Sequence, residues 1–161
     1  MYLKSFSNCV QIILVLLIFP CLGSVPGGLV AHPDGKHIIY PLGCTLIVKD
    51  VSTHKQSFLS GHSNNISCLA CSPSGVYLAS GQVTHMGFKA NVIIWSFHDR
   101  KLYCRLSLHK VKVQAVAFSP NDKYLATLGG RDDNRYVLVN GPKFFLLQRH
   151  NFFYIMHHLF D

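Results

Sequence analysis

The middle of the chain consists of short runs of apolar and polar residues, separated by turns rich in proline, glycine, serine and aspartate. In the run 66–70, Ile66, Cys68 and Ala70 would lie on one face of a strand, because successive side chains of a strand alternate in direction. The run 92–95 is apolar at every position, which is typical of a strand buried on both faces. This pattern predicts an all-β chain of short strands.

A turn of similar composition starts at residues 33, 73 and 120, so that its copies are 40 and 47 residues apart. Gly61-His62 and Leu108-His109 repeat the second spacing. Spacings of this size with short strands indicate the blade repeat of a β-propeller. The middle unit contains strands at 66–70, 76–80, 92–95 and 101–108, and the next unit at 113–118, 124–128 and 136–139. In the first unit only 29–33, 36–40 and 45–48 can be placed. We therefore expect about two and a half four-stranded antiparallel blades within residues 25–141.

The repeat resembles the WD40 family. Gly61-His62 stands at the family's Gly-His position and Trp95-Ser96 at its Trp-Asp position. The resemblance implies a buried hydrogen-bond set in each blade, formed by a His, a Ser or Thr, a Trp and a turn Asp. The implied members here are Gly61, His62, Ser80 and Trp95 in the middle blade and His109, Thr127 and Asp132 in the next. No turn Asp is evident in the middle blade, and Val139 replaces the Trp of the next. These roles are structural.

Longer stretches, at 32–44, 55–70, 77–90 and 105–133, resemble the WD-repeat proteins of motile cilia and flagella. This likeness implies a non-enzymatic scaffold on axonemal doublet microtubules, of the microtubule inner protein type, that contributes to ciliary motility. The implied partners are tubulin and other inner proteins, and no small-molecule substrate, cofactor or metal is implied. The implied location is the cytoplasm and the axoneme of the cilium.

The connection 82–90 is longer than the turn usual between the corresponding strands of a WD40 blade. Insertions on a repeat scaffold tend to lie on a binding face. We therefore interpret Met86, Phe88 and Lys89 as a partner-binding loop.

The two ends differ in composition from the repeats. Residues 1–24 combine Lys4 with an apolar run, which is the pattern of a secretory signal or of an alternative first exon. As a signal, this segment would make the chain a secreted or endoplasmic-reticulum protein-binding module, with Asn65 as a glycosylation acceptor. Residues 142–161 form an aromatic-rich tail in which Phe145, Phe152 and Ile155 would share one helical face.

The net charge of +8, with a pI near 9.3, favours an acidic partner. The basic residues are scattered and no nucleic-acid motif accompanies them, so we expect an acidic protein surface rather than nucleic acid. Cys68 and Cys71 would point to opposite faces of one strand, which argues against a shared metal. No motif joins a nucleophile, a base and an orienting group, so we expect no enzyme.

Overall fold

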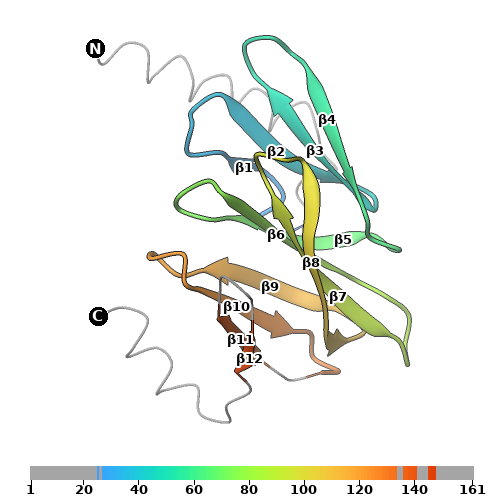
Figure 1. Ribbon diagram of the computed structural model, residues 1–161. Helices are drawn as coiled ribbons and strands as arrows, with labels where there is room; N and C mark the ends of the chain where they lie inside the picture. The colour runs from blue at the N-terminus through green and yellow to red at the C-terminus, as the bar shows by residue number, and fades with distance from the viewer. Residues whose placement is uncertain (1–24, 26, 134–135, 141–144, 148–161) are drawn as a thin grey trace.

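The computed structural model describes residue 25 and residues 27–133, 136–140 and 145–147. This part of the chain forms three four-stranded antiparallel sheets that are stacked one on the next (Figure 1). The predicted all-β propeller architecture is confirmed. Within the described residues no helix is long and apolar enough to cross a membrane.

Each sheet is one blade with its strands in chain order. Blade 1 contains β1 (Val30–Ala31), β2 (His37–Leu42), β3 (Thr45–Asp50) and β4 (Gln56–Ser60).

Blade 2 lies between the other two blades. It contains β5 (Ile66–Cys71), β6 (Tyr77–Gln82), β7 (Lys89–Ser96) and β8 (Lys101–Lys110).

Blade 3 packs against the other face of blade 2. It contains β9 (Val113–Phe118), β10 (Tyr124–Gly129), β11 (Tyr136–Asn140) and β12 (Phe145–Leu147).

Two of these strands were not expected from the sequence. β4 pairs with β3 and completes blade 1, and β12 pairs with β11 beyond the expected boundary at residue 141. The count of two and a half blades was therefore too low, and the helical interpretation was wrong for Phe145. Outer strands carry a weak sequence signal, because exposed residues interrupt their apolar pattern, as the alternating exposure of β4 shows. The remaining tail residues and the segment 1–24 lie outside the described residues.

The core consists of the two interfaces of blade 2. Val92 and Ile94 of β7 pack toward blade 3 with Val113 and Leu125, and all four are fully buried. Ile93 and Trp95 belong to the opposite cluster, which includes residues of blade 1 such as Ile39 and Leu46. The uninterrupted apolar run of β7 thus fills two interfaces, as expected for a strand with both faces covered.

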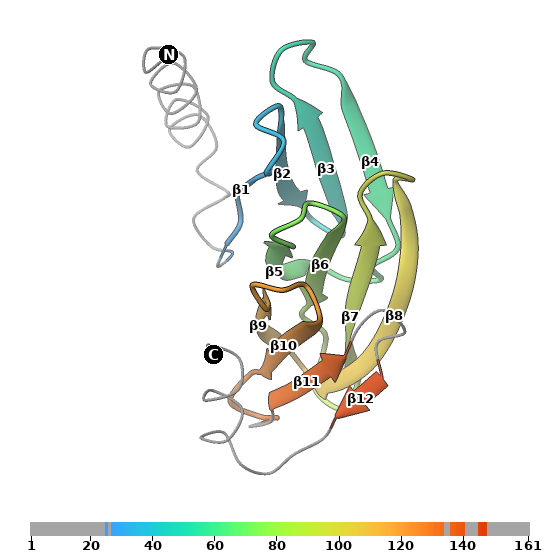
Figure 2. The ribbon, with the colours of Figure 1, turned by 60° about the vertical axis from the view of Figure 1, so that its left-hand side comes forward.

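The turns between the first two strands of the blades lie one below another (Figures 1 and 2). We call these turns, at residues 32–36, 72–76 and 119–123, the first turns. In blade 1 the first turn bonds to its neighbour in blade 2, where the Nε2 of His32 lies 2.8 Å from the carbonyl oxygen of Gly75. In blade 2 the N–H of Ser74 donates to Oδ2 of Asp122 in blade 3 at 3.1 Å.

Candidate functional site

The buried hydrogen-bond set of blade 2 joins three of its elements. His62 precedes β5, Ser80 lies on β6 and Trp95 on β7. The indole Nε1–H of Trp95 donates to Oγ of Ser80 at 2.8 Å, and Nε2 of His62 lies 2.7 Å from the same oxygen. The structure thus brings together the three residues that the sequence singled out in this blade.

Gln82 completes this set and was missed in the sequence. Its Oε1 lies 2.9 Å from Nδ1 of His62, so the imidazole donates from Nδ1 and accepts the hydroxyl proton of Ser80 at Nε2. Burial lowers the pKa of His62 in spite of this bond, and the charge of Arg105 lowers it further. A neutral imidazole therefore links β6 to the segment before β5.

Gly61 is needed for close packing beside the indole. A Cβ added at Gly61 would lie 2.8 Å from Cη2 of Trp95, well inside van der Waals contact. Its carbonyl oxygen also accepts a hydrogen bond from the guanidinium of Arg105 at 2.7 Å.

Blade 3 has the same arrangement, with Asp133 as the partner of the histidine and Val139 in the place of the tryptophan. Nε2 of His109 lies 2.8 Å from Oγ1 of Thr127, and Nδ1 lies 2.6 Å from Oδ2 of Asp133. The acidic member is therefore Asp133, and the assignment of this role to Asp132 was wrong. Asp132 is exposed, whereas the turn bond from the N–H of Asp133 to the carbonyl oxygen of Gly130 aims the side chain of Asp133 inward.

Val139 occupies the place of the tryptophan in blade 3. It pairs with Leu125 as Trp95 pairs with Leu78, and both Val139 and Trp95 are buried. A valine side chain has no N–H, so Thr127 receives no indole bond. Its Oγ1 lies 3.3 Å from the carbonyl oxygen of Val137, as Oγ of Ser80 lies 3.5 Å from that of Ile93.

These hydrogen-bond sets are buried too deeply to act on a substrate. Ser80 and Trp95 are at most 1% exposed, and His109 is 1% exposed. Every polar atom named in them already has a partner inside the blade. Their chemistry is that of cross-strand fastening, in which buried polar groups are satisfied by one another.

The connection between β6 and β7 is a six-residue loop, 83–88, which follows the end of β6 at Gln82. Met86 and Phe88 are 83% and 67% exposed, and Lys89 is also exposed. This loop projects to the right of the blades in Figure 1. Large exposed apolar side chains on a protruding loop are the kind of surface that contacts partners.

The base of the 83–88 loop is held by the junction between blades 2 and 3. The N–H of Thr84 donates to the carbonyl oxygen of Val111 at 2.6 Å, and the N–H of Val111 donates to the carbonyl oxygen of Phe88 at 3.1 Å. Val111 has a φ of 60°, a conformation that β-branched residues rarely adopt. Lys110 and Lys112 flank it, so three lysines, with Lys89, surround the loop base.

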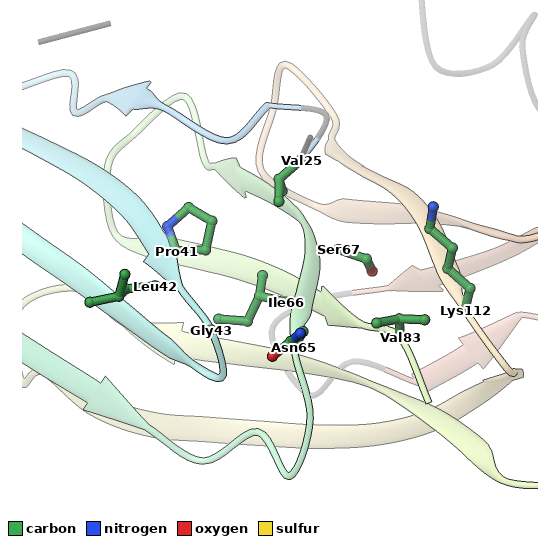
Figure 3. Close-up of a pocket in the computed structure, with 9 residues that line it drawn as sticks. All are labelled: Val25, Pro41, Leu42, Gly43, Asn65, Ile66, Ser67, Val83 and Lys112. Carbon is green, nitrogen blue, oxygen red and sulfur yellow. The ribbon is translucent and has the colours of Figure 1, made fainter. Parts of the chain in front are cut away.

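A hollow of about 280 Å³ lies beside this base (Figure 3). Its lining includes Leu42 at the end of β2 and Gly43 of the β2–β3 turn, Ile66 and Ser67 of β5, and Val83 and Lys112 on the far side. Among the described residues that line it, Lys112 is the charged one.

The cysteines of β5 are structural. Cys68 packs in the interface with blade 3 and Cys71 against the interface with blade 1, as the strand alternation predicts. Burial raises the pKa of Cys68 to about 11 and that of Cys71 to about 12, so both remain thiols at neutral pH. Among the described residues, His32 and Asp34 of the first turn of blade 1, with His37 at the start of β2, have the composition of a metal site.

Several relatives identified by sequence are named for cilia and flagella. Cilia- and flagella-associated protein 52 of Sus scrofa and of Homo sapiens are each 60% identical over 116 residues, which is 72% of this chain and 19% of theirs. The protein of the same name from Chlamydomonas reinhardtii is 56% identical over 117 residues, again 72% of this chain and 19% of that one. The chain thus spans about a fifth of the length of these relatives.

Solved structures agree on the fold. The structure of U3-55K superposes with a TM-score of 0.65 at 22% identity, covering 74% of this chain and 37% of that one. The crystal structure of the RRP9 WD40 repeats gives the same TM-score at 23% identity, covering 74% and 36%. The family model "WD domain, G-beta repeat" matches residues 53–96 and 100–137. Together with the blade topology and the buried His–Ser–Trp set, these matches show that the chain belongs to the WD40 repeat family.

Proposed function

We propose that the chain is a non-enzymatic WD-repeat scaffold of motile cilia and flagella, which binds axonemal doublet microtubules from inside and contributes to ciliary motility. The observation that carries this proposal is the identity of 56–60% to proteins named for cilia and flagella from mammals and from Chlamydomonas reinhardtii. A generic WD40 blade does not explain this level, because solved propellers of similar shape are only 22–23% identical.

The charge of the chain suits this partner. Tubulin has an acidic surface, and the net charge of +8 favours association with an acidic protein. Charge complementarity of this kind mainly raises the association rate and weakens with salt. Binding should therefore be salt-dependent.

The 83–88 loop is the contact that we propose for this partner, through Met86, Phe88 and Lys89. The apolar side chains of Met86 and Phe88 supply area that is removed from water on binding. Lys89 and the two lysines beside Val111 at the loop base supply the complementary charge. The backbone bonds to Val111 fix the loop before binding, which lowers the entropy cost of association.

Localisation of a C-terminally tagged chain in ciliated cells tests the ciliary role, with glycosidase treatment of the same lysate. Axonemal signal without a mobility shift supports the proposal. A reticular or secreted signal with a glycosidase-sensitive shift contradicts it and favours the secretory alternative, in which exposed Asn65 carries a glycan.

Co-sedimentation with microtubules tests the loop. The double variant Met86→Ser/Phe88→Ser leaves the backbone bonds in place, and we expect binding to weaken by about tenfold or more, because one interface hot spot contributes about 2 kcal/mol. Phe58→Ser is the matched control, since Phe58 is 62% exposed on blade 1. Equal binding of the loop variant and the control would refute the assignment of the loop.

A further inference from the structure

The three first turns have the same backbone, so each serves as a control for the others. The N–H of the residue before each proline donates across the turn at 2.9 Å, in the pairs His32–His37, Ser72–Tyr77 and Ser119–Tyr124. Gly35, Gly75 and Asp122 occupy the same place, with φ of 68°, 77° and 58°.

Two of these turns are built without histidine. In blades 2 and 3 the serine Oγ accepts the N–H of the tyrosine that starts the next strand, at 3.0 Å in both Ser72–Tyr77 and Ser119–Tyr124. At its first and last positions the turn therefore requires only a small polar residue and an aromatic residue.

Blade 1 differs at the three corresponding positions. His32 stands in place of the serine, Asp34 in place of Ser74 or Asn121, and His37 in place of the tyrosine. The turn uses a polar acceptor at the second of these positions, because Asn121 and Ser74 accept the equivalent N–H to the one that Asp34 accepts. It requires neither a carboxylate there nor a histidine at either side, because the other blades form it without them.

The three exchanged side chains converge on one point. Oδ2 of Asp34 lies 2.6 Å from Nδ1 of His37 and 3.0 Å from Nδ1 of His32. The three potential ligand atoms lie within 4.8 Å of one another. Two imidazoles and a carboxylate are the donors that zinc and related divalent ions take in proteins.

Neighbouring groups fix the orientation of the potential metal ligands. Nε2 of His32 donates to the carbonyl oxygen of Gly75, which leaves the lone pair of Nδ1 toward Asp34. Ligating histidines in proteins commonly make such a bond from the other nitrogen. The ring of His32 is also stacked on Phe97, with centroids 3.6 Å apart, while His37 meets Phe97 edge-on at 5.3 Å.

The carboxylate of Asp34 is oriented by the backbone. Its Oδ1 accepts the N–H groups of Lys36 and His37 at 2.9 and 3.1 Å, so that Oδ2 faces the imidazoles. Burial opposes ionisation here, but these bonds and those to the two histidines hold the pKa of Asp34 well below its usual range. The group is therefore a carboxylate at neutral pH.

The Nδ1 atom of His32 and Oδ2 of Asp34 are close together, and both are electron-rich when His32 is neutral. With Nε2 protonated, a neutral His32 places a lone pair 3.0 Å from a carboxylate oxygen, and the N–H of Asp34 at 3.2 Å is its other partner. A proton on Nδ1 or a bound cation removes this repulsion. Arg100 lies nearby, over the ring of Phe97 at 3.7 Å, and its charge opposes a cation to some extent.

We propose that His32 Nδ1, Asp34 Oδ2 and His37 Nδ1 bind a divalent transition-metal ion of the zinc type. The ion takes the place of the proton that Nδ1 of His37 shares with Asp34 in this structure, and that proton is released to solvent. Tetrahedral ligands at about 2.0–2.1 Å from the metal are roughly 3.3 Å apart, so the carboxylate oxygen withdraws by less than about 1 Å from each nitrogen. His32 is buried, but Asp34 is 30% and His37 21% exposed, so water has access as a fourth ligand. Because His32 packs on Gly75 and Phe97, the ion fastens blade 1 to blade 2.

Titration of the 161-residue chain, without an affinity tag, with Zn²⁺ in a calorimeter tests the site, and the visible absorption of Co²⁺ reports its geometry. We expect one ion per chain at this site with tetrahedral Co²⁺ bands. The variant His32→Ser/Asp34→Ser/His37→Tyr reproduces the residues of blade 2 and should weaken binding more than tenfold. Phe97→Leu removes the ring that contacts both histidines and lies under Arg100, but it leaves the three ligands in place. It should weaken binding by about tenfold, as the loss of outer groups of metal sites does.

Two controls keep the test decisive. His85→Ala removes an exposed histidine of the 83–88 loop, at the other end of blade 2, and should leave the affinity unchanged. Tryptophan fluorescence of each variant checks that blade 2 is folded. Unchanged affinity in the folded triple variant, or loss of binding in His157→Ala/His158→Ala, would place the ion elsewhere and overturn the proposal. The ciliary function would stand in either case, since it rests on other residues.

Discussion

Replacement of Ser80 by alanine tests the role of the buried hydrogen-bond set most directly. The hydroxyl of Ser80 is both the acceptor for the indole N–H of Trp95 and the donor to Nε2 of His62. Alanine keeps the backbone and the β6 pairing but removes both bonds. Because Ser80 is 0% exposed, water does not readily replace the hydroxyl.

The expected loss of stability follows from the two groups left without a partner. A buried donor or acceptor without a partner costs about 1–3 kcal/mol. Two such groups, partly relieved by small movements, give a loss of about 2–5 kcal/mol in the free energy of unfolding. This is a large share of the 5–15 kcal/mol that stabilises an ordinary domain.

Urea denaturation followed by fluorescence measures this loss, because Trp95 is the single tryptophan of the chain. With a urea dependence of roughly 1–3 kcal/mol per molar, the midpoint should fall by about 1–3 M. The control is Ser60→Ala on exposed β4, which should change stability by less than about 0.5 kcal/mol. A midpoint for Ser80→Ala within the range of this control would refute the argument.

Three further predictions follow from the same geometry. The pKa of His62 is lowered in the folded state, so on acidification the imidazole is protonated in the unfolded chain before it is protonated in the folded one. The free energy of unfolding of the wild type should therefore fall below about pH 6.5, by up to about 1.4 kcal/mol per pH unit. Urea unfolding at several pH values should show a weaker dependence of this free energy on pH for His62→Gln. Asp133→Ala should cost about 2 kcal/mol in thermal or urea unfolding by removing the partner of a buried histidine, whereas exposed Asp132→Ala should cost less than about 0.5 kcal/mol; the reverse order would restore the original assignment. Gly75→Ala should lower the melting temperature more than Gly87→Ala. Both glycines have positive φ, but only at Gly75 would a Cβ lie 2.7 Å from the imidazole ring of His32. Equal shifts in melting temperature would show that this ring moves aside without loss of stability.

The sequence predicted the inner strands well because their signals are local. The strand at 113–118 has its predicted bounds, and the apolar run 92–95 lies inside β7. The proline turns ended the strands where proline and a residue with positive φ are required. For β4 and β12 no such local signal exists, since an outer strand is stabilised mainly by its pairing partner.

The errors within the candidate site have a different origin. Asp132 and Asp133 are adjacent and chemically equal, so only the turn geometry decides which one reaches His109. Gln82 was detectable, because residues two apart on a strand share a face and Ser80 already pointed to His62. An amide was overlooked where the family has a carboxylate.

Repetition within one chain separates structural from functional residues without any outside comparison. The β2–β3 turn of blade 1 needs only Gly43 and Cys44, yet the corresponding connection of blade 2 has the six residues 83–88 with exposed apolar tips. Folding therefore does not require this loop, just as it does not require histidine in a first turn. Residues that are absent from one blade although its four-stranded sheet still forms are not required for folding, and they can bind a partner or an ion instead. Both proposals rest on this reasoning, and they concern opposite ends of the blades, so a partner at the loop and an ion at the first turn can be bound together.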